Sequence, residues 1–173
     1  MEQSDDARKP THELIARQYR GSLAMLGKAI ELCPEPLWLS NDYRNRFWHI
    51  AYHAVFYTHL YLQPSEGDFT PWVKHRKDSN YLGARPWAPQ EPFVLPEPYT
   101  KSEVLEYFAL CRAEVEKQAP LLDLDAPSGF PWLHFNKLEL QFYNIRHVQH
   151  HTGQLADRLR TAANIGVDWV RSE

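Results

Sequence analysis

The sequence predicts an all-α fold, a four-helix bundle with a long proline-rich crossover between the second and third helices. Several segments place apolar residues three and four positions apart, the spacing of one helix face, and no stretch alternates as a strand would. Residues 64–99 contain seven prolines. At 20.3 kDa the chain fits one compact unit, so we expect a single domain over 1–173 with its core at about 11–166.

The first predicted helix runs from about Thr11 to Leu32. Its apolar side chains recur every three or four residues and so share one face. Thr11 follows Pro10 and is placed to cap the N-terminus. The run Cys33-Pro34-Glu35-Pro36 ends the helix, because proline cannot continue one.

The second predicted helix starts near Ser40, has Asn41 and Asp42 in its first turn, and ends at about Gln63. Residues 47–62 are aromatic or aliphatic on nearly every side, which is typical of a central, buried helix. The same stretch nevertheless carries three histidines, His49, His53 and His59. Buried polar rings need partners, so these histidines indicate a site.

Residues 64–99 form the predicted crossover. Seven prolines exclude one regular helix and argue against a central strand. The segment far exceeds the usual connection of about 4–6 residues, and long ordered loops tend to cover sites or meet partners. Trp72, Trp87 and Phe93 indicate that it packs onto the bundle, where the two tryptophans could line a pocket. An ordered crossover without a role in chemistry is the alternative.

The third predicted helix opens with a capping box, Thr100 with Glu103, and ends near Gln118. The last runs from about Asn136, which provides a similar cap, to Ala163, and Gly166 beyond it suits a left-handed cap. One face of the last helix is mostly apolar and is expected to point inward. It carries Leu140, Tyr143, His147, His151, Leu155 and Leu159.

Composition excludes several classes of partner. A formal charge of −3 and a pI near 6.3 give no basic footprint for nucleic acid. No segment reaches the roughly 18 uncharged apolar residues of a membrane span, and the acidic N-terminus is unlike a signal peptide. Cys33 and Cys111 belong to no CxxC pair and read as isolated, buried thiols. We therefore expect a cytoplasmic protein that binds neither nucleic acid nor membrane.

His147 and His151 are the strongest functional signal. Four residues apart on a helix, their Cβ atoms stand about 6 Å apart, so both imidazoles can reach one ion. Their face points inward, and unpartnered imidazoles in a core carry a desolvation cost that a metal ion would remove. Three imidazoles and an open position suit zinc, nickel, iron or cobalt, and we expect zinc or nickel.

The third ligand is expected from the second helix. His49 and His53 share one face there, and both lie near the level of the late pair, so position alone barely separates them. His59 is too near the helix end. His150 points about 100° away from the pair and is expected to be partly exposed.

The remaining histidines, His12, His75 and His134, sit at helix starts or in loops and are expected to be solvated.

The late motif His147-x-x-x-His151-x-Gly153-Gln154-Leu155 resembles the DinB-like (DinB/YfiT) superfamily. A helix-two histidine followed by an apolar-aromatic cluster, His53 and then Leu60-Tyr61-Leu62, adds to the resemblance, which covers about 11–166. It implies a four-helix bundle holding a divalent ion through His53, His147 and His151, with His49 in reserve. Thr58 stands where many relatives have an acidic residue, which leaves substrate contacts open.

Relatives of this kind imply metal-dependent transfer of a low-molecular-weight thiol to a small-molecule substrate, or a hydrolase-like reaction. Gln154 could orient a ligand, whereas no catalytic carboxylate can be assigned, and Asp42 and Asp157 read as surface charges. The alternatives are a non-catalytic metal-binding or sensing bundle, a bis-histidine haem protein without an attachment motif, and buried histidines with no ion. The aromatic surplus is compatible with a homodimer.

Overall fold

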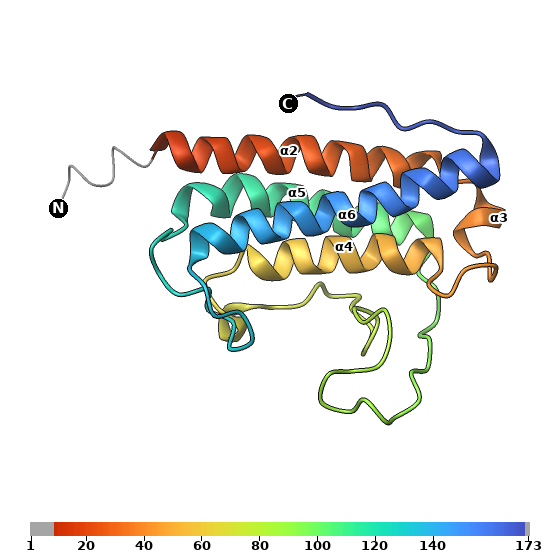
Figure 1. Cartoon of the computed structure of the whole chain (residues 1–173), viewed down its shortest axis with the longest axis horizontal. Helices are drawn as coiled ribbons and strands as arrows, with labels where there is room; N and C mark the ends of the chain where they lie inside the picture. The colour runs from red at the N-terminus through yellow and green to blue at the C-terminus, as the bar shows by residue number, and fades with distance from the viewer. Residues whose placement is uncertain (1–8, 172–173) are drawn as a thin grey trace.

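The computed structural model describes residues 9–171, which are all-helical and contain no strand (Figure 1), so the predicted all-α class is confirmed for this part of the chain. The long helices are α2 (Lys9–Leu32), α4 (Phe47–Tyr61), α5 (Lys101–Gln118) and α6 (Lys137–Ala163). Shorter elements join them: α3 (Glu35–Trp38) and the 3-10 turns η1 (Glu66–Asp68) and η2 (Ala119–Leu121). No described helix is long and apolar enough to cross a membrane.

Helices α2 and α4 each pack against both α5 and α6, and the four lie side by side along the long axis of the molecule (Figure 1). Helix α4 is the most deeply enclosed. Of its 15 residues, 13 are buried, and only His53 and Tyr57 keep part of their surface exposed. The apolar pattern of residues 47–62 therefore correctly predicts a buried helix, and its two partly exposed residues mark where it meets a cavity.

Helix α4 begins at Phe47, seven residues later than the sequence indicates. The Ser40 hydroxyl binds the Asp42 carboxylate at 2.8 Å and accepts from the Asp42 backbone N–H at 3.1 Å, which closes a local turn instead of capping a helix. From α6, Arg158 donates to the Asn45 carbonyl at 2.7 Å and stacks over the Tyr43 ring. These contacts fix residues 40–46 outside the helix.

The crossover between α4 and α5 runs beneath α4 in Figure 1 and contains no helix beyond η1. Trp72 is buried and stacks on Tyr107 of α5 with ring centroids 4.9 Å apart. Tyr99 anchors the far end of the crossover, since its hydroxyl accepts from the Arg76 backbone N–H at 2.7 Å. The expectation that Trp72 lines a pocket is therefore wrong, because its ring is used in packing against α5.

The predicted caps hold at the starts of α5 and α6 but fail at two other helix ends. Helix α2 already includes Lys9 and Pro10, so Thr11 lies within the helix instead of capping it. Thr100 and Glu103 form both bonds of the capping box, and the Asn136 side chain accepts from the Glu139 N–H at 2.9 Å. Helix α6 ends at Ala163, but Asn164, with φ of 54°, takes the left-handed position assigned to Gly166. Asparagine tolerates that conformation better than other residues with a Cβ, which explains the difference.

A buried lysine ties the start of α6 to the end of α4. Lys137 is 3% exposed, and its ammonium donates to the carbonyls of Gln63 at 3.0 Å and Pro64 at 2.8 Å and to that of Ser128. Gly129, at φ 84°, brings the preceding turn so close to Pro64 that an added Cβ would lie 2.1 Å from the Pro64 oxygen. The turn before α6 is thus pressed against the end of α4.

Candidate metal centre

His53 of α4 and the pair His147 and His151 of α6 meet at one point. The Nε2 atom of His147 lies 2.9 Å from that of His53 and 3.0 Å from that of His151. One nitrogen from each ring lies within 4.8 Å of the others, a group that could hold a metal ion. The structure therefore brings His53, which the resemblance implies as the third ligand, together with the pair that the sequence singles out.

Hydrogen bonds on the far side of two rings fix where their protons are. His53 Nδ1 lies 2.7 Å from the Asn80 backbone oxygen, which can only accept, so Nδ1 carries the proton. His151 Nδ1 lies 2.9 Å from Oε1 of Gln154 and donates to it in the same way. Gln154 thus orients His151, as the sequence suggests. In both rings the inward Nε2 is left as a bare lone pair, the form that binds metals.

His147 cannot satisfy both of these lone pairs by itself. A neutral imidazole has a single N–H, so its Nε2 can donate to one neighbour and must meet the other lone pair to lone pair. Its Nδ1 is buried and makes no hydrogen bond. A cation at the centre would accept all three lone pairs at once. Ligands about 2.1 Å from a tetrahedral ion stand about 3.4 Å apart, so small shifts of the rings from their separations of 2.9 and 3.0 Å would admit the ion.

Burial keeps the three rings neutral. Desolvation, reinforced by the neighbouring histidines, lowers the pKa of His53 well below the usual value and that of His147 to about 3. Burial also lowers the pKa of His151, although the hydrogen bond that its ring donates to Gln154 opposes the shift. Metal binding requires deprotonated imidazole, so at neutral pH these rings are already in the binding form.

The other histidines of α4 stay out of the group. His49, the reserve ligand, is fully buried between Trp48 and Phe93, with ring centroids 4.8 and 5.9 Å away, and neither of its nitrogens is hydrogen-bonded. His59 is also buried, and its Nδ1 lies 3.1 Å from the Tyr107 hydroxyl. Each is therefore a packed ring outside the cluster.

Outside α4, His150 and His134 are exposed, as expected. His75 is not the solvated loop residue that the sequence suggests, because its Nδ1 binds the Tyr52 hydroxyl at 2.6 Å and its ring stacks on Tyr52. His12 is half-buried, with Nε2 2.8 Å from the Leu122 carbonyl oxygen. These two contacts connect segments far apart in the sequence, which local patterns do not reveal.

A cavity of about 570 Å³ opens directly onto the histidines. His53 and His147 form one end of it, and both are partly exposed, whereas His151 behind them is 6% exposed. The crossover contributes a wall through Trp87, as the sequence suggests, together with Tyr81 and Pro86. The cavity has a volume typical of small-molecule sites. The histidine group therefore faces a space that a substrate could enter.

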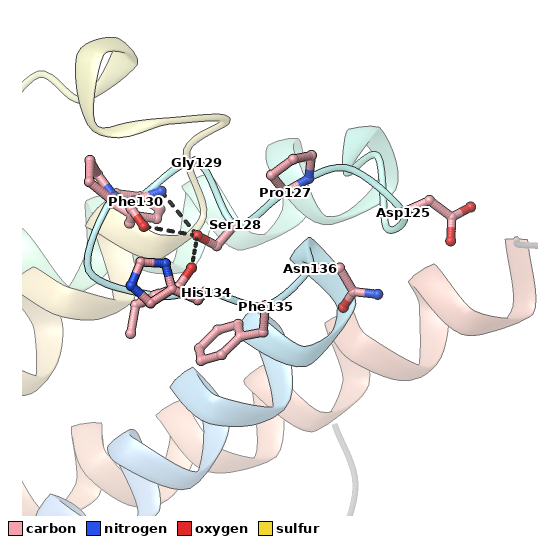
Figure 2. Close-up of a pocket in the computed structure, with 10 residues that line it drawn as sticks. Asp125, Pro127, Ser128, Gly129, Phe130, His134, Phe135 and Asn136 are labelled. Carbon is pink, nitrogen blue, oxygen red and sulfur yellow. Dashed lines mark hydrogen bonds between the residues drawn. The ribbon is translucent and has the colours of Figure 1, made fainter.

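The turn before α6 carries a second, more open hollow of about 610 Å³ (Figure 2). In Figure 2 the Ser128 hydroxyl holds the turn, accepting from the Phe130 N–H at 3.1 Å and donating to the Leu133 carbonyl at 2.7 Å. The titratable residues lining it, Asp125 and His134, are exposed. This hollow lacks the converging histidines of the first cavity.

Sequence reasoning missed several parts of the site. The Asn80 carbonyl and Trp132 come from segments without a regular pattern. Tyr57 and Tyr143 were detectable, because each lies four residues from a histidine ligand, Tyr57 from His53 and Tyr143 from His147. That spacing places the tyrosines on the ligand-bearing faces of α4 and α6.

The two cysteines and two of the aspartates lie where the sequence predicts, and Thr58 does not reach the cavity. Both cysteines, Cys33 and Cys111, are free and buried, and burial raises the pKa of each thiol, that of Cys33 to about 12. Asp42 and Asp157 are exposed. Thr58 is buried, and its hydroxyl donates to the Ala54 carbonyl at 2.7 Å, so it contributes no group to the cavity.

Comparisons with protein-family models, with curated proteins and with solved structures give no match to this chain. The histidine group and the cavity beside it are therefore the observations from which a function can be inferred.

Proposed function

We propose that this protein is a metal-dependent enzyme of the DinB-like kind, a four-helix bundle that holds a divalent ion, zinc or nickel, through His53, His147 and His151. The observation that carries the proposal is the convergence of three Nε2 atoms at the wall of a cavity. Three protein ligands leave a coordination position for a nucleophile or substrate, which is the arrangement of catalytic rather than structural sites. The late motif and the order of the long helices support the resemblance.

When bound, such an ion lowers the pKa of a coordinated thiol or water, or polarises an electrophile. The chain's own residues prepare the site for it. The Asn80 carbonyl and Gln154 fix the tautomers of His53 and His151, so that two lone pairs already point inward. Trp87 and Tyr81 from the crossover line one wall of the cavity beside the reacting groups. The reaction is thiol transfer to a small molecule, or hydrolysis if water takes the thiol's place.

Elemental analysis of protein purified without an immobilised-metal column tests the metal site. We expect one equivalent of a divalent transition metal in the wild type and in His134→Ala, the exposed-loop control, and a loss of metal in His53→Ala and His151→Ala. Metal content that is the same in all four proteins would refute the site.

Turnover is tested separately, with the metal-loaded protein, a panel of electrophiles and esters, and cysteine or another small thiol. A rate that disappears in His147→Ala and in metal-free protein supports the enzyme. Stoichiometric metal with no rate above the metal-free control would instead favour a non-catalytic metal-binding or sensing protein.

A further inference from the structure

The cavity beside the histidines is a corridor of aromatic rings. Six aromatic side chains line it: Tyr57, Tyr61, Tyr81, Trp87, Trp132 and Tyr143. Along α4, Tyr57 and Tyr61 follow His53 at successive four-residue steps, so Tyr61 lies about 12 Å from His53 along the helix. The Tyr57 ring is 5.6 Å from that of His147, and the Tyr61 ring is 5.9 Å from that of Tyr143. Helices α4 and α6 thus run antiparallel here and carry rings from the ion site to the far end.

Two pairs of lining rings contact each other at steep angles, Tyr61 with Tyr143 at the far end and Tyr81 with Trp87 on the wall formed by the crossover. Tyr61 and Tyr143 meet at 72°, and Tyr81 and Trp87 meet at 83° with centroids 5.2 Å apart. At these separations the two rings of each pair touch edge to face, and together the pairs offer the cavity both ring faces and ring edges. Tyrosine and tryptophan faces attract a cation within about 6 Å of the ring centroid. The far end therefore offers a cation three aromatic rings, those of Tyr61, Tyr143 and the half-exposed Trp132.

Apart from the histidines, the charge on the residues that line the cavity is negative. Glu66, at the start of η1, is the charged side chain among the lining residues, and no lysine or arginine lines the cavity in the described part of the chain. The Glu66 carboxylate is exposed and forms no ion pair with a described residue. Arg146 lies 5.6 Å from the Tyr143 ring centroid but does not line the cavity. Away from the histidines, a carboxylate or phosphate on a ligand would meet no lysine or arginine among the lining residues.

We propose that the cavity binds a small molecule bearing a methylated ammonium group, which the rings and Glu66 hold at the far end while its reactive end reaches the histidines. This inference rests on the proposed function, because it names the substrate class of the same site. A methylated ammonium is weakly hydrated and needs few hydrogen bonds, which suits a wall of rings with a single carboxylate. A volume of about 570 Å³ accommodates a small molecule.

The probes are choline and 3,3-dimethylbutan-1-ol, which have the same shape and differ in the positive charge. Binding is measured by calorimetry and by tryptophan fluorescence, with Trp169→Phe as the control because Trp169 is exposed and outside the cavity. Choline should bind about tenfold more tightly than its neutral isostere. Equal affinity, or binding of neither probe at millimolar concentration, would overturn the proposal.

Variants assign the binding to the cavity. Glu66→Gln should weaken choline binding severalfold and leave the isostere unaffected, and Trp132→Leu should remove the preference for choline, with recovery in Trp132→Phe. Choline affinity unchanged in both Glu66→Gln and Trp132→Leu would overturn the proposal. Co-sedimentation with phosphatidylcholine vesicles in place of free choline binding would also overturn it, since the occupant would then be a membrane surface.

Failure of this inference is distinguishable from failure of the proposed function. Metal content is measured on the same protein samples, and choline binding is tested both with and without metal. Retained metal with no preference for choline contradicts the inference alone, whereas absence of metal with a retained choline preference contradicts the metal centre alone.

Discussion

Lowering the pH should destabilise the fold through His49. The ring is fully buried, and neither nitrogen has a hydrogen-bond partner. Burial, with a smaller contribution from Arg46, lowers its pKa to about 4, although the backbone of Ser79 and Tyr81 offsets part of the effect. The unfolded chain takes up a proton at an ordinary pKa near 6.5, whereas the folded chain does so only near 4.

This difference in pKa sets the direction and the size of the change in the free energy of unfolding. Between pH 6.5 and pH 4 the unfolded state binds more protons at this position, so stability falls as the pH falls through that window. The difference between a pKa of 6.5 in the unfolded chain and about 4 in the folded chain corresponds to a loss of about 3 kcal/mol. That is a large part of the stability of an ordinary domain.

Urea denaturation of metal-free protein at a series of pH values measures the loss. His49→Leu removes the titrating ring, so we expect its free energy of unfolding to rise by about 3 kcal/mol relative to the wild type between pH 6.5 and pH 4. Ile50→Leu changes the packing one residue along without removing a titrating group, and its difference from the wild type should stay constant. Parallel wild-type and His49→Leu profiles would refute the reasoning.

Three further changes test the surrounding structure. Gln154→Leu removes the acceptor that orients His151, and we expect metal affinity to fall by about tenfold in a competition titration with a chelator. Lys137→Met leaves buried carbonyls without a donor and should lower the free energy of unfolding by about 3 kcal/mol. Gly129→Ala places a Cβ against the Pro64 oxygen at a positive φ, and a loss of about 3 kcal/mol is expected from denaturation curves.

A control variant or a contradicting outcome tests each of these three predictions. Gln149→Leu alters the same helix away from the ligands, where Gln149 contacts Met25, and should leave metal affinity unchanged. Equal affinity in Gln154→Leu and Gln149→Leu would mean that the Gln154 bond does not matter for the ion. Wild-type stability in Lys137→Met or Gly129→Ala would show that the turn before α6 is not pressed against α4 as described.

The sequence predicts the long helices well because their apolar periodicity and caps are local. The Thr100 capping box and the end of α6 at Ala163 depend on neighbouring residues. The start of α4, in contrast, does not depend on neighbouring residues alone. Ser40 and Asp42 resemble a helix start, yet their side chains bond to each other, and Arg158, more than a hundred residues later, holds the chain there. Such a boundary depends on tertiary contacts and cannot be predicted from a window of sequence.

In the candidate site, too, some features can be predicted from the sequence and others depend on tertiary packing. His147 and His151 lie on one helix at a fixed spacing, so their pairing is a property of the sequence. The choice of His53 over His49 depends on how α4 is rotated against α6, and the structure settles which ring joins the group. Glu66 and Trp132 enter the cavity from irregular segments, and no periodic pattern marks them.

The division of the three histidines between two helices has a consequence for which ion is preferred. Two of the three histidines, His147 and His151, belong to α6. The helix therefore sets the distance between them, and this distance cannot adjust to the radius of the ion. The third histidine, His53, belongs to α4, so its distance from the other two depends on the separation between α4 and α6. Lys137 fastens those two helices together a few turns away, at the carbonyls of Gln63 and Pro64. For the ion that we propose, the packing of α4 against α6 would therefore contribute to selectivity together with the ligands themselves.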